Sequence, residues 1–178
     1  EVLTERPVPP DALAPERLAD IQRQFTGAMA QVPPMYSALK KDGRALYEYA
    51  RAGVAVERAA RQVEIFELKL APALDAEGYQ AINIVVKCSK GTYIRTLGED
   101  IGAALGCGAH LIGLRRTGSG GVSLDGSVTL EALQAMTEAE REEWLQPVDV
   151  LLSDWPEVTL VESEAARFLT GLRRRVKL

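Results

Sequence analysis

The sequence predicts an α+β fold in which a mainly antiparallel sheet is flanked by helices. Residues 63–70 and 80–88 have the composition of two strands, and the polar stretch Asp75–Gly78 lies between them. Apolar residues recur at helical spacing after this pair, over 94–105, and before it, over 15–25. A hairpin with a helix on either side in the sequence is typical of this fold class.

The first helix is expected to begin at Pro15, because proline is favoured in the first helical turn. Leu18, Ile21 and Phe25 then recur at helical spacing until Gly27. One apolar face on this helix is therefore predicted.

Residues 32–39 are not expected to be helical, because Pro33 and Pro34 interrupt any helix there. A basic turn, 40–44, follows this segment. A short helix is predicted over 46–52, ending at Gly53.

The second strand of the predicted hairpin alternates in polarity, as a strand with one buried face should. Its inward residues are expected to be Ile82, Ile84, Val86 and Cys88, and we expect antiparallel pairing with the first strand. The helix that follows Gly91 should bury Leu97 and Ile101 on one face and end at Gly106.

The remainder of the chain has weaker signals. Caps at Thr129 and Thr137, the latter with Glu140 at capping-box spacing, predict two short helices. The other expectations are a strand at 110–116, a glycine-rich turn at 118–121, a boundary at 147–156, a strand near 158–161, a helix over 163–170 and an unfinished element at 172–178.

Charge is unevenly distributed along the chain, whose net charge is −4. Residues 36–61 contain six basic and three acidic side chains, and residues 87–116 contain five and two. Residues 124–167 contain two basic and eleven acidic side chains. The two basic segments suit phosphate and the acidic one does not. Charge alone leaves RNA contact and ordinary solvated surface equally open.

Several classes of protein are disfavoured by composition. No apolar run approaches the roughly 18 residues of a membrane span, and residues 1–10 do not form a signal peptide, so we expect a cytoplasmic protein. Cys88 and Cys107 are too few for a disulfide framework. Cys107 and His110 could begin a metal site, but no second ligand pair is nearby, and we expect no metal.

The stretch 88–97, Cys-Ser-Lys-Gly-Thr-Tyr-Ile-Arg-Thr-Leu, lies where a strand is expected to lead into a helix. Within one turn it places a cation at Lys90, an aromatic ring at Tyr93 and a guanidinium at Arg95. Such a junction suits an anionic ligand, since the helix start offers free N–H groups and the two cations lie beside it. A capped helix with surface charge is the plainer alternative.

Three segments together resemble the TruB family of pseudouridine synthases: 33–40 (Pro-Pro-Met-Tyr-Ser-Ala-Leu-Lys), 88–97, and 106–116 (Gly-Cys-Gly-Ala-His-Leu-Ile-Gly-Leu-Arg-Arg). The tracts 46–53 and 128–131 match as well, and the resemblance extends over about residues 20–150. The bacterial form of the pattern is closer than that of the guide-RNA-dependent relatives.

The resemblance implies roles for three residues. Tyr93 falls on a tyrosine that contacts a flipped-out uridine, and Leu114 on an aliphatic residue that packs against the same base. Arg95 falls on an arginine that orients the nucleophilic aspartate. From the residues alone, Tyr93 and Leu114 would be taken as ordinary core.

The resemblance also implies tRNA as the partner, with conversion of uridine 55 in its T loop to pseudouridine by a monomeric enzyme that uses no cofactor. A thumb-like insertion around 33–53, here called the thumb segment, would hold the T arm. The residues expected near RNA are Lys40, Lys41, Arg44, Lys90, Arg115 and Arg116.

The family's nucleophile belongs to a Gly-x-Leu-Asp-Pro-x-Ala motif that these 178 residues do not contain, and Leu124-Asp125-Gly126 only superficially resembles it. We therefore expect residues 1–150 to be the second half of a catalytic domain whose first half precedes Glu1, and this chain alone to be inactive. Residues 151–178 would begin an incomplete PUA-like RNA-binding domain.

Two other functions remain open at this point. The chain could be a non-catalytic module that binds or folds tRNA, or a relative that depends on a guide RNA. Binding to unmodified tRNA without a guide separates the last possibility from the bacterial enzyme.

Overall fold

The structure is a computed structural model that describes residues 5–171. It divides the chain into two compact units, Glu1–Gly113 and Leu114–Leu178. The expectation for residues 172–178 lies outside the described residues.

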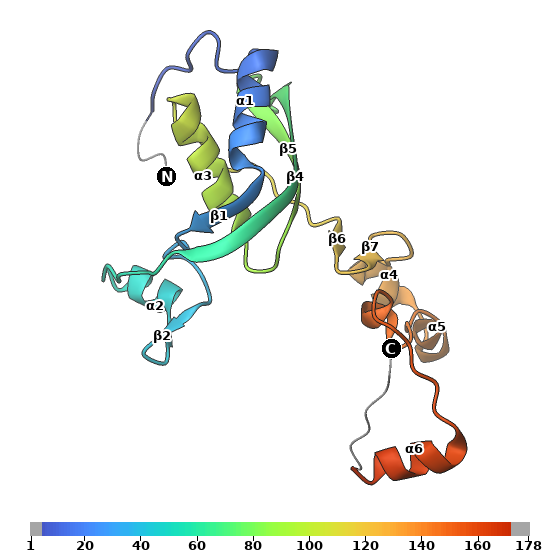
Figure 1. The fold of residues 1–178 in the computed structure, drawn as a ribbon. Coiled ribbons are helices and arrows are strands. Elements are labelled where there is room, and N and C mark those ends of the chain that lie inside the picture. Colours follow the sequence, from blue (N-terminus) through green and yellow to red (C-terminus); the bar gives the residue numbers. More distant parts are fainter. Residues whose placement is uncertain (1–4, 172–178) are drawn as a thin grey trace. The chain divides into compact units, whose positions relative to one another are not determined.

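The first unit contains an antiparallel sheet of three strands in the order β1–β4–β5 (Figure 1). The strands are β1 (Gly27–Gln31), β4 (Arg61–Leu74) and β5 (Gln80–Cys88). The central strand β4 pairs with β1 from Gly27↔Ile65 to Gln31↔Arg61, and with β5 through Leu74↔Gln80 near the hairpin turn. The predicted antiparallel hairpin is confirmed. Strand β1 was not predicted.

Two helices, α1 (Pro15–Phe25) and α3 (Ile94–Leu105), pack on one face of this sheet (Figure 1). The core between the layers contains Ile21, Ile65, Leu97 and Ile101, each at most 2% exposed. Strand β5 contributes its alternate residues, among them Ile84 and Val86, as the polarity pattern predicted. The α+β prediction is thus confirmed.

Both helices begin and end where their sequences indicate. Pro15 stands in the first turn of α1, and Gly106 ends α3 in the left-handed conformation with φ of 90°. An L residue with a side chain would be strained at that φ, whereas glycine is not. The side chain of Arg17 on α1 also donates to the carbonyl of Ala104 near the end of α3, at 2.6 Å.

The thumb segment forms a small hairpin and a short helix beside the sheet (Figure 1). Strands β2 (Lys40–Lys41) and β3 (Arg44–Ala45) are joined by a two-residue turn, and α2 (Leu46–Arg51) follows directly. Asp42 and Gly43 in the turn both have positive φ, as a type I′ turn requires. The predicted helix over 46–52 is therefore confirmed.

The second unit consists of short elements: β6 (Gly118–Ser119), β7 (Val122–Ser123), α4 (Leu130–Ala135), α5 (Glu138–Glu143), a 3-10 turn (Val150–Leu152) and α6 (Glu162–Leu169). The predicted caps are present, since the hydroxyls of Thr129 and Thr137 accept from Ala132 and Glu140 backbone N–H groups. Arg141 on α5 donates to the carbonyls of Leu133 and Gln134 and so links α5 to the end of α4.

Two predicted strands are wrong. Residues 110–116 and 158–161 have no regular secondary structure, although 111–114 contains three apolar side chains and 158–161 is rich in β-branched residues. A strand requires a neighbour that completes its backbone hydrogen bonds. Within the described residues neither segment pairs with another strand, and Ile112 and Val161 are 68% and 64% exposed.

Candidate functional site

The loop between β5 and α3 is fastened to the central strand of the sheet. The backbone N–H of Ser89 donates to the carbonyl of Glu64 at 2.8 Å, and the Glu64 N–H donates to the Ser89 hydroxyl at 2.9 Å. The Thr92 hydroxyl donates to the carbonyl of Ser89 at 2.9 Å. Between them Gly91 turns the chain with φ of 85°. This loop is therefore a fixed platform for the first turn of α3.

Tyr93 occupies the N-cap position of α3, with an extended backbone at φ of −97° and ψ of 105°. Its backbone is held from a distant element, because the carboxamide of Gln31 accepts from the Tyr93 N–H at 2.8 Å and donates to the Tyr93 carbonyl at 3.2 Å. The tyrosine itself is half-buried. The fold thus fixes the point from which the phenol extends.

Arg95 lies one residue into α3 and is exposed. Its guanidinium donates to the backbone carbonyl of Tyr36 in the thumb segment at 2.7 Å. The start of α3 and the thumb segment are therefore in direct contact. In residues 5–171 none of the ion pairs includes Arg95, and its expected pairing with a catalytic aspartate stays a prediction.

The basic residues of the thumb segment are exposed and partly engaged. Lys41 donates through Nζ to the carbonyl of Glu57 at 2.9 Å. The Arg44 guanidinium lies 5.0 Å from the ring centre of Tyr49 and its Nε lies 3.6 Å from a Glu48 carboxylate oxygen. A cation above an aromatic ring is held in place at modest energy. These contacts arrange the charges without burying them.

Lys90 is also exposed, in the loop before α3. Tyr93, Arg95 and Lys90 thus share one junction, and the contact between Arg95 and Tyr36 connects that junction to the thumb segment. The first unit thus places Lys90, Tyr93 and Arg95 at one junction, whereas Lys40, Lys41 and Arg44 lie on the β2–β3 hairpin of the thumb segment.

Leu114, Arg115 and Arg116 belong to the second unit. All three are exposed, Leu114 at 67%. The expected place of Leu114 against the same base as Tyr93 stays a prediction.

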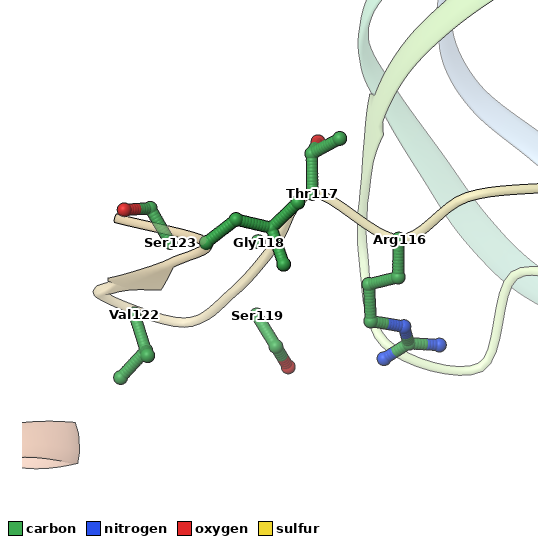
Figure 2. Close-up of a pocket in the computed structure, with 7 residues that line it drawn as sticks. Arg116, Thr117, Gly118, Ser119, Val122 and Ser123 are labelled. Atoms are coloured by element: carbon green, nitrogen blue, oxygen red, sulfur yellow. The ribbon is translucent and has the colours of Figure 1, made fainter. Parts of the chain in front are cut away.

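Arg116 borders a shallow hollow on the β6–β7 hairpin, which Val122 and Leu124 also line. Figure 2 shows the side chains of Arg116, Ser119 and Val122 extending to one side of this hairpin. A single exposed guanidinium beside small polar residues has the chemistry of a phosphate contact and no catalytic group.

The described residues contain no cluster of three or more His, Cys, Asp or Glu side chains that could hold a metal ion. Cys88 and Cys107 are free thiols. No helix among residues 5–171 is long and apolar enough to span a membrane. Burial raises the pKa of the Asp100 carboxyl group, on α3, above its usual range.

Sequence reasoning missed Gln31 and the strand that contains it. The signal was present, since Gly27, Met29 and Gln31 alternate with the exposed Ala28 and Ala30. Five residues with two alanines and a glycine have little strand propensity of their own, and pairing with β4 overrides this. Gln31 is 2% exposed, which makes it one of the most buried polar side chains of the first unit.

The fold and the junction define an α+β protein with an aromatic and basic site at the start of a buried helix. Residues 1–94 match the model of the TruB family pseudouridylate synthase N-terminal domain, and residues 95–153 match that of the tRNA pseudouridylate synthase B C-terminal domain. The chain belongs to the TruB family of pseudouridylate synthases.

Similar proteins of known name agree with this assignment. The chain is 61% identical over 174 residues to tRNA pseudouridine synthase B of Verminephrobacter eiseniae, covering 98% of this chain and 53% of that protein. It is 56% identical over 179 residues to the protein of the same name from Ralstonia nicotianae, covering 100% and 56%. The Burkholderia lata protein is 57% identical over 173 residues, covering 97% and 52%. The chain thus spans about half the length of the relatives it matches.

Proposed function

We propose that the protein is a tRNA pseudouridine synthase that isomerises uridine 55 in the T loop of tRNA. One observation supports this most: in a chain of the TruB family, Tyr93 and Arg95 stand together on a junction that is hydrogen-bonded to two strands. The proposed reaction breaks the glycosidic bond after attack by an aspartate, rotates the base and rejoins it through carbon. No metal or cofactor takes part.

Tyr93 and Leu114 would replace the stacking neighbours that a flipped-out uridine loses, since an extruded base needs flat or apolar surfaces. Arg95 would hold the nucleophilic carboxylate ionised and aimed, because a guanidinium can donate two parallel hydrogen bonds to it. The exposure of Arg95 supports this role, since its remaining donors are accessible.

The thumb segment would bind the T arm through phosphate. Lys40, Lys41 and Arg44 lie on one exposed hairpin, and Lys90, Arg115 and Arg116 are exposed too. We propose tRNA as the partner of a monomeric, cytoplasmic enzyme, with a separate RNA-binding domain that begins near residue 151.

The nucleophile would come from outside residues 1–178, because the aspartate motif expected from the family is not in this sequence. The 178 residues alone should then bind tRNA without modifying it.

The test is a pseudouridine assay on an unmodified tRNA transcript. The complete gene product should convert one T-loop uridine, and its Arg95→Met variant should lose most of that rate. The 178-residue chain should give no product. Product from the 178 residues alone would refute the placement of the nucleophile, and an inactive complete gene product would refute the function.

Binding measurements separate the two rival functions. A complete protein that binds unmodified tRNA but never forms pseudouridine is a binding or folding module. Activity that appears only when a guide RNA is added would indicate the guide-dependent relative. Activity on tRNA alone is the outcome we expect.

A further inference from the structure

We propose that Gln31 is a positioning residue for Tyr93 and Arg95: its carboxamide fixes the start of α3 so that Tyr93 meets the base, and Arg95 the nucleophilic carboxylate, in one geometry. This inference rests on the proposed function for its catalytic consequence. The contact itself is seen in the first unit, between the last residue of β1 and the N-cap of α3.

The geometry of the contact is that of a paired amide. Gln31 Oε1 accepts from the Tyr93 N–H at 2.8 Å, and Gln31 Nε2 donates to the Tyr93 carbonyl at 3.2 Å. The Gln31 side chain satisfies both backbone groups of one residue from 62 positions away in the sequence. Among the side chains, only a carboxamide or a protonated carboxyl has a donor and an acceptor in this arrangement.

The helix has no local alternative to this contact. No side chain caps α3 locally at Tyr93, although N-cap residues usually satisfy the first free N–H groups of a helix themselves. The apolar residues Leu97, Ile101 and Leu105 hold the body of α3 against the sheet. Such packing is not directional. The hydrogen bonds of Gln31 act directly on the N-cap residue and add to those that fasten the preceding loop to β4.

The buried glutamine contributes both to stability and to the orientation of the first turn of α3. Each of its hydrogen bonds contributes only about 0.5–1.5 kcal/mol net, and burial of the amide without partners would cost more than that. An apolar side chain of the same volume would fill this position beside Met29 but leave the Tyr93 N–H and carbonyl without their partner, at about 1–3 kcal/mol for each group that stays buried. The particular gain from the carboxamide is orientation, which is what a catalytic tyrosine and arginine need.

Reaction rate should depend strongly on this orientation. A shift of about 1 Å in a catalytic group can slow a reaction about 100-fold. Tyr93 and Arg95 leave the backbone on either side of the first helical residue, Ile94, so one displacement of this turn moves both. Binding of tRNA through exposed lysines and arginines elsewhere should change little.

The test uses the complete gene product with three variants. Gln31→Met keeps the volume and loses both hydrogen bonds. Gln31→Glu keeps the acceptor and, when ionised, loses the donor. Gln62→Met is the matched control, because Gln62 is an exposed glutamine on the neighbouring strand β4.

Single-turnover rate and tRNA affinity are measured separately on an unmodified transcript. Gln31→Met should lower the rate about 10- to 100-fold, with a Kd for tRNA within about twofold of the original. Gln62→Met should match the unsubstituted protein in both. An unchanged rate for folded Gln31→Met overturns the inference.

The pH profile of Gln31→Glu separates positioning from space filling. Burial raises the pKa of a carboxyl group, and the protonated form can donate to the Tyr93 carbonyl as glutamine does. The rate of Gln31→Glu relative to the unsubstituted protein should therefore rise as the pH falls. A ratio independent of pH would mean that Gln31 only fills space. The pH profile of Gln31→Glu also tests the inference if Gln31→Met does not fold.

Amide hydrogen exchange gives a readout that does not need activity. A peptide covering residues 90–97 should exchange faster in Gln31→Met than in Gln62→Met, since the Tyr93 N–H loses its acceptor. Equal exchange would overturn the inference. If the unsubstituted protein forms no pseudouridine, the proposed function fails, and exchange still decides whether Gln31 holds Tyr93.

Discussion

The three basic side chains at the tip of the thumb segment differ in whether they already have interaction partners within the protein. Lys41 donates to the carbonyl of Glu57, and Arg44 lies beside Glu48 and Tyr49. In the described part of the chain, Lys40 has no hydrogen-bond or ion-pair partner for its ammonium group. Lys40 should therefore be the residue most available to a phosphate.

Substitution of Lys40 and Lys41 by alanine should weaken tRNA binding across different tRNAs. Each lysine that contacts phosphate should add about one unit to the slope of log affinity against log salt. Titrations at several salt concentrations measure this slope. Lys69→Ala is the control, because Lys69 lies on β4 and pairs with Glu67. An unchanged slope and affinity in the double variant would remove the thumb segment from the RNA interface.

Glu140 shows how one cap changes a titration. The backbone N–H and hydroxyl of Thr137 both donate to its carboxylate, and they lower the pKa of Glu140 below its usual range. A carboxyl group whose pKa is lowered in the folded protein stabilises the fold at pH values above its ordinary pKa. That contribution is lost as the pH falls through the lowered value.

Thr137→Ala should bring the pKa of Glu140 back toward its usual range, because the hydroxyl donor is removed and the capping geometry is weakened. Carboxyl chemical shifts followed against pH measure this directly. Glu138, in the first turn of the same helix, is the internal reference. A Glu140 titration that does not respond to the substitution would mean that the cap does not form in solution.

At the scale of elements, the glycine with least space for a side chain is Gly102 on α3. An added Cβ at Gly102 would lie 2.3 Å from the backbone nitrogen of Ala109 and 2.4 Å from the carbonyl carbon of Gly108. The Gly108 N–H also donates to the Gly102 carbonyl at 2.9 Å. The turn after α3 therefore folds back on the helix at this glycine.

Gly102→Ala should destabilise the first unit despite the helical preference for alanine. Alanine improves helix propensity by about 1 kcal/mol, but overpacking against backbone costs about 1–3 kcal/mol or more. Denaturant unfolding followed by circular dichroism gives the difference in free energy. Gly113→Ala is the control, since a Cβ there has nothing within 4 Å. Equal stability of the two variants would contradict this packing.

Two strands that the sequence predicted are not present in the structure, and they show what a sequence pattern cannot predict about an element. Residues 158–161 have strand composition and residues 111–114 are mostly apolar, yet neither forms a strand, whereas β1 forms one without such a composition. Whether a segment becomes a strand depends on a partner with free backbone groups, and composition does not contain that information. Among the elements predicted correctly, α1, α3 and the β4–β5 hairpin have both a repeating polarity pattern and an explicit terminator or turn.

For the molecule as a whole, the difference between the two units is one of burial. The first unit contains the core of α1, β4, β5 and α3, whereas the helices α4, α5 and α6 of the second bury no residue fully. The first unit should accordingly resist local opening more than the second.

Limited trypsin digestion should cut first at Arg115 or Arg116, which are exposed in the irregular stretch at the boundary of the units. A fragment that ends there should persist, because its cleavable residues lie mostly in helices and paired strands. Mass spectrometry of the time course identifies the fragment. Early cleavage at Lys69 or Lys87, within β4 and β5, would contradict the assignment of the stable core.

The sequence by itself determined the fold class, the principal helices and hairpin, the helix caps and the family, because periodicity, caps and motif order are local or linear properties of a chain. Tertiary structure alone decided that Gln31 on an unpredicted strand holds Tyr93, and that Arg95 contacts the Tyr36 carbonyl. These contacts join residues 62 and 59 positions apart. Only the packing of α3 across the sheet brings such residues within hydrogen-bonding distance.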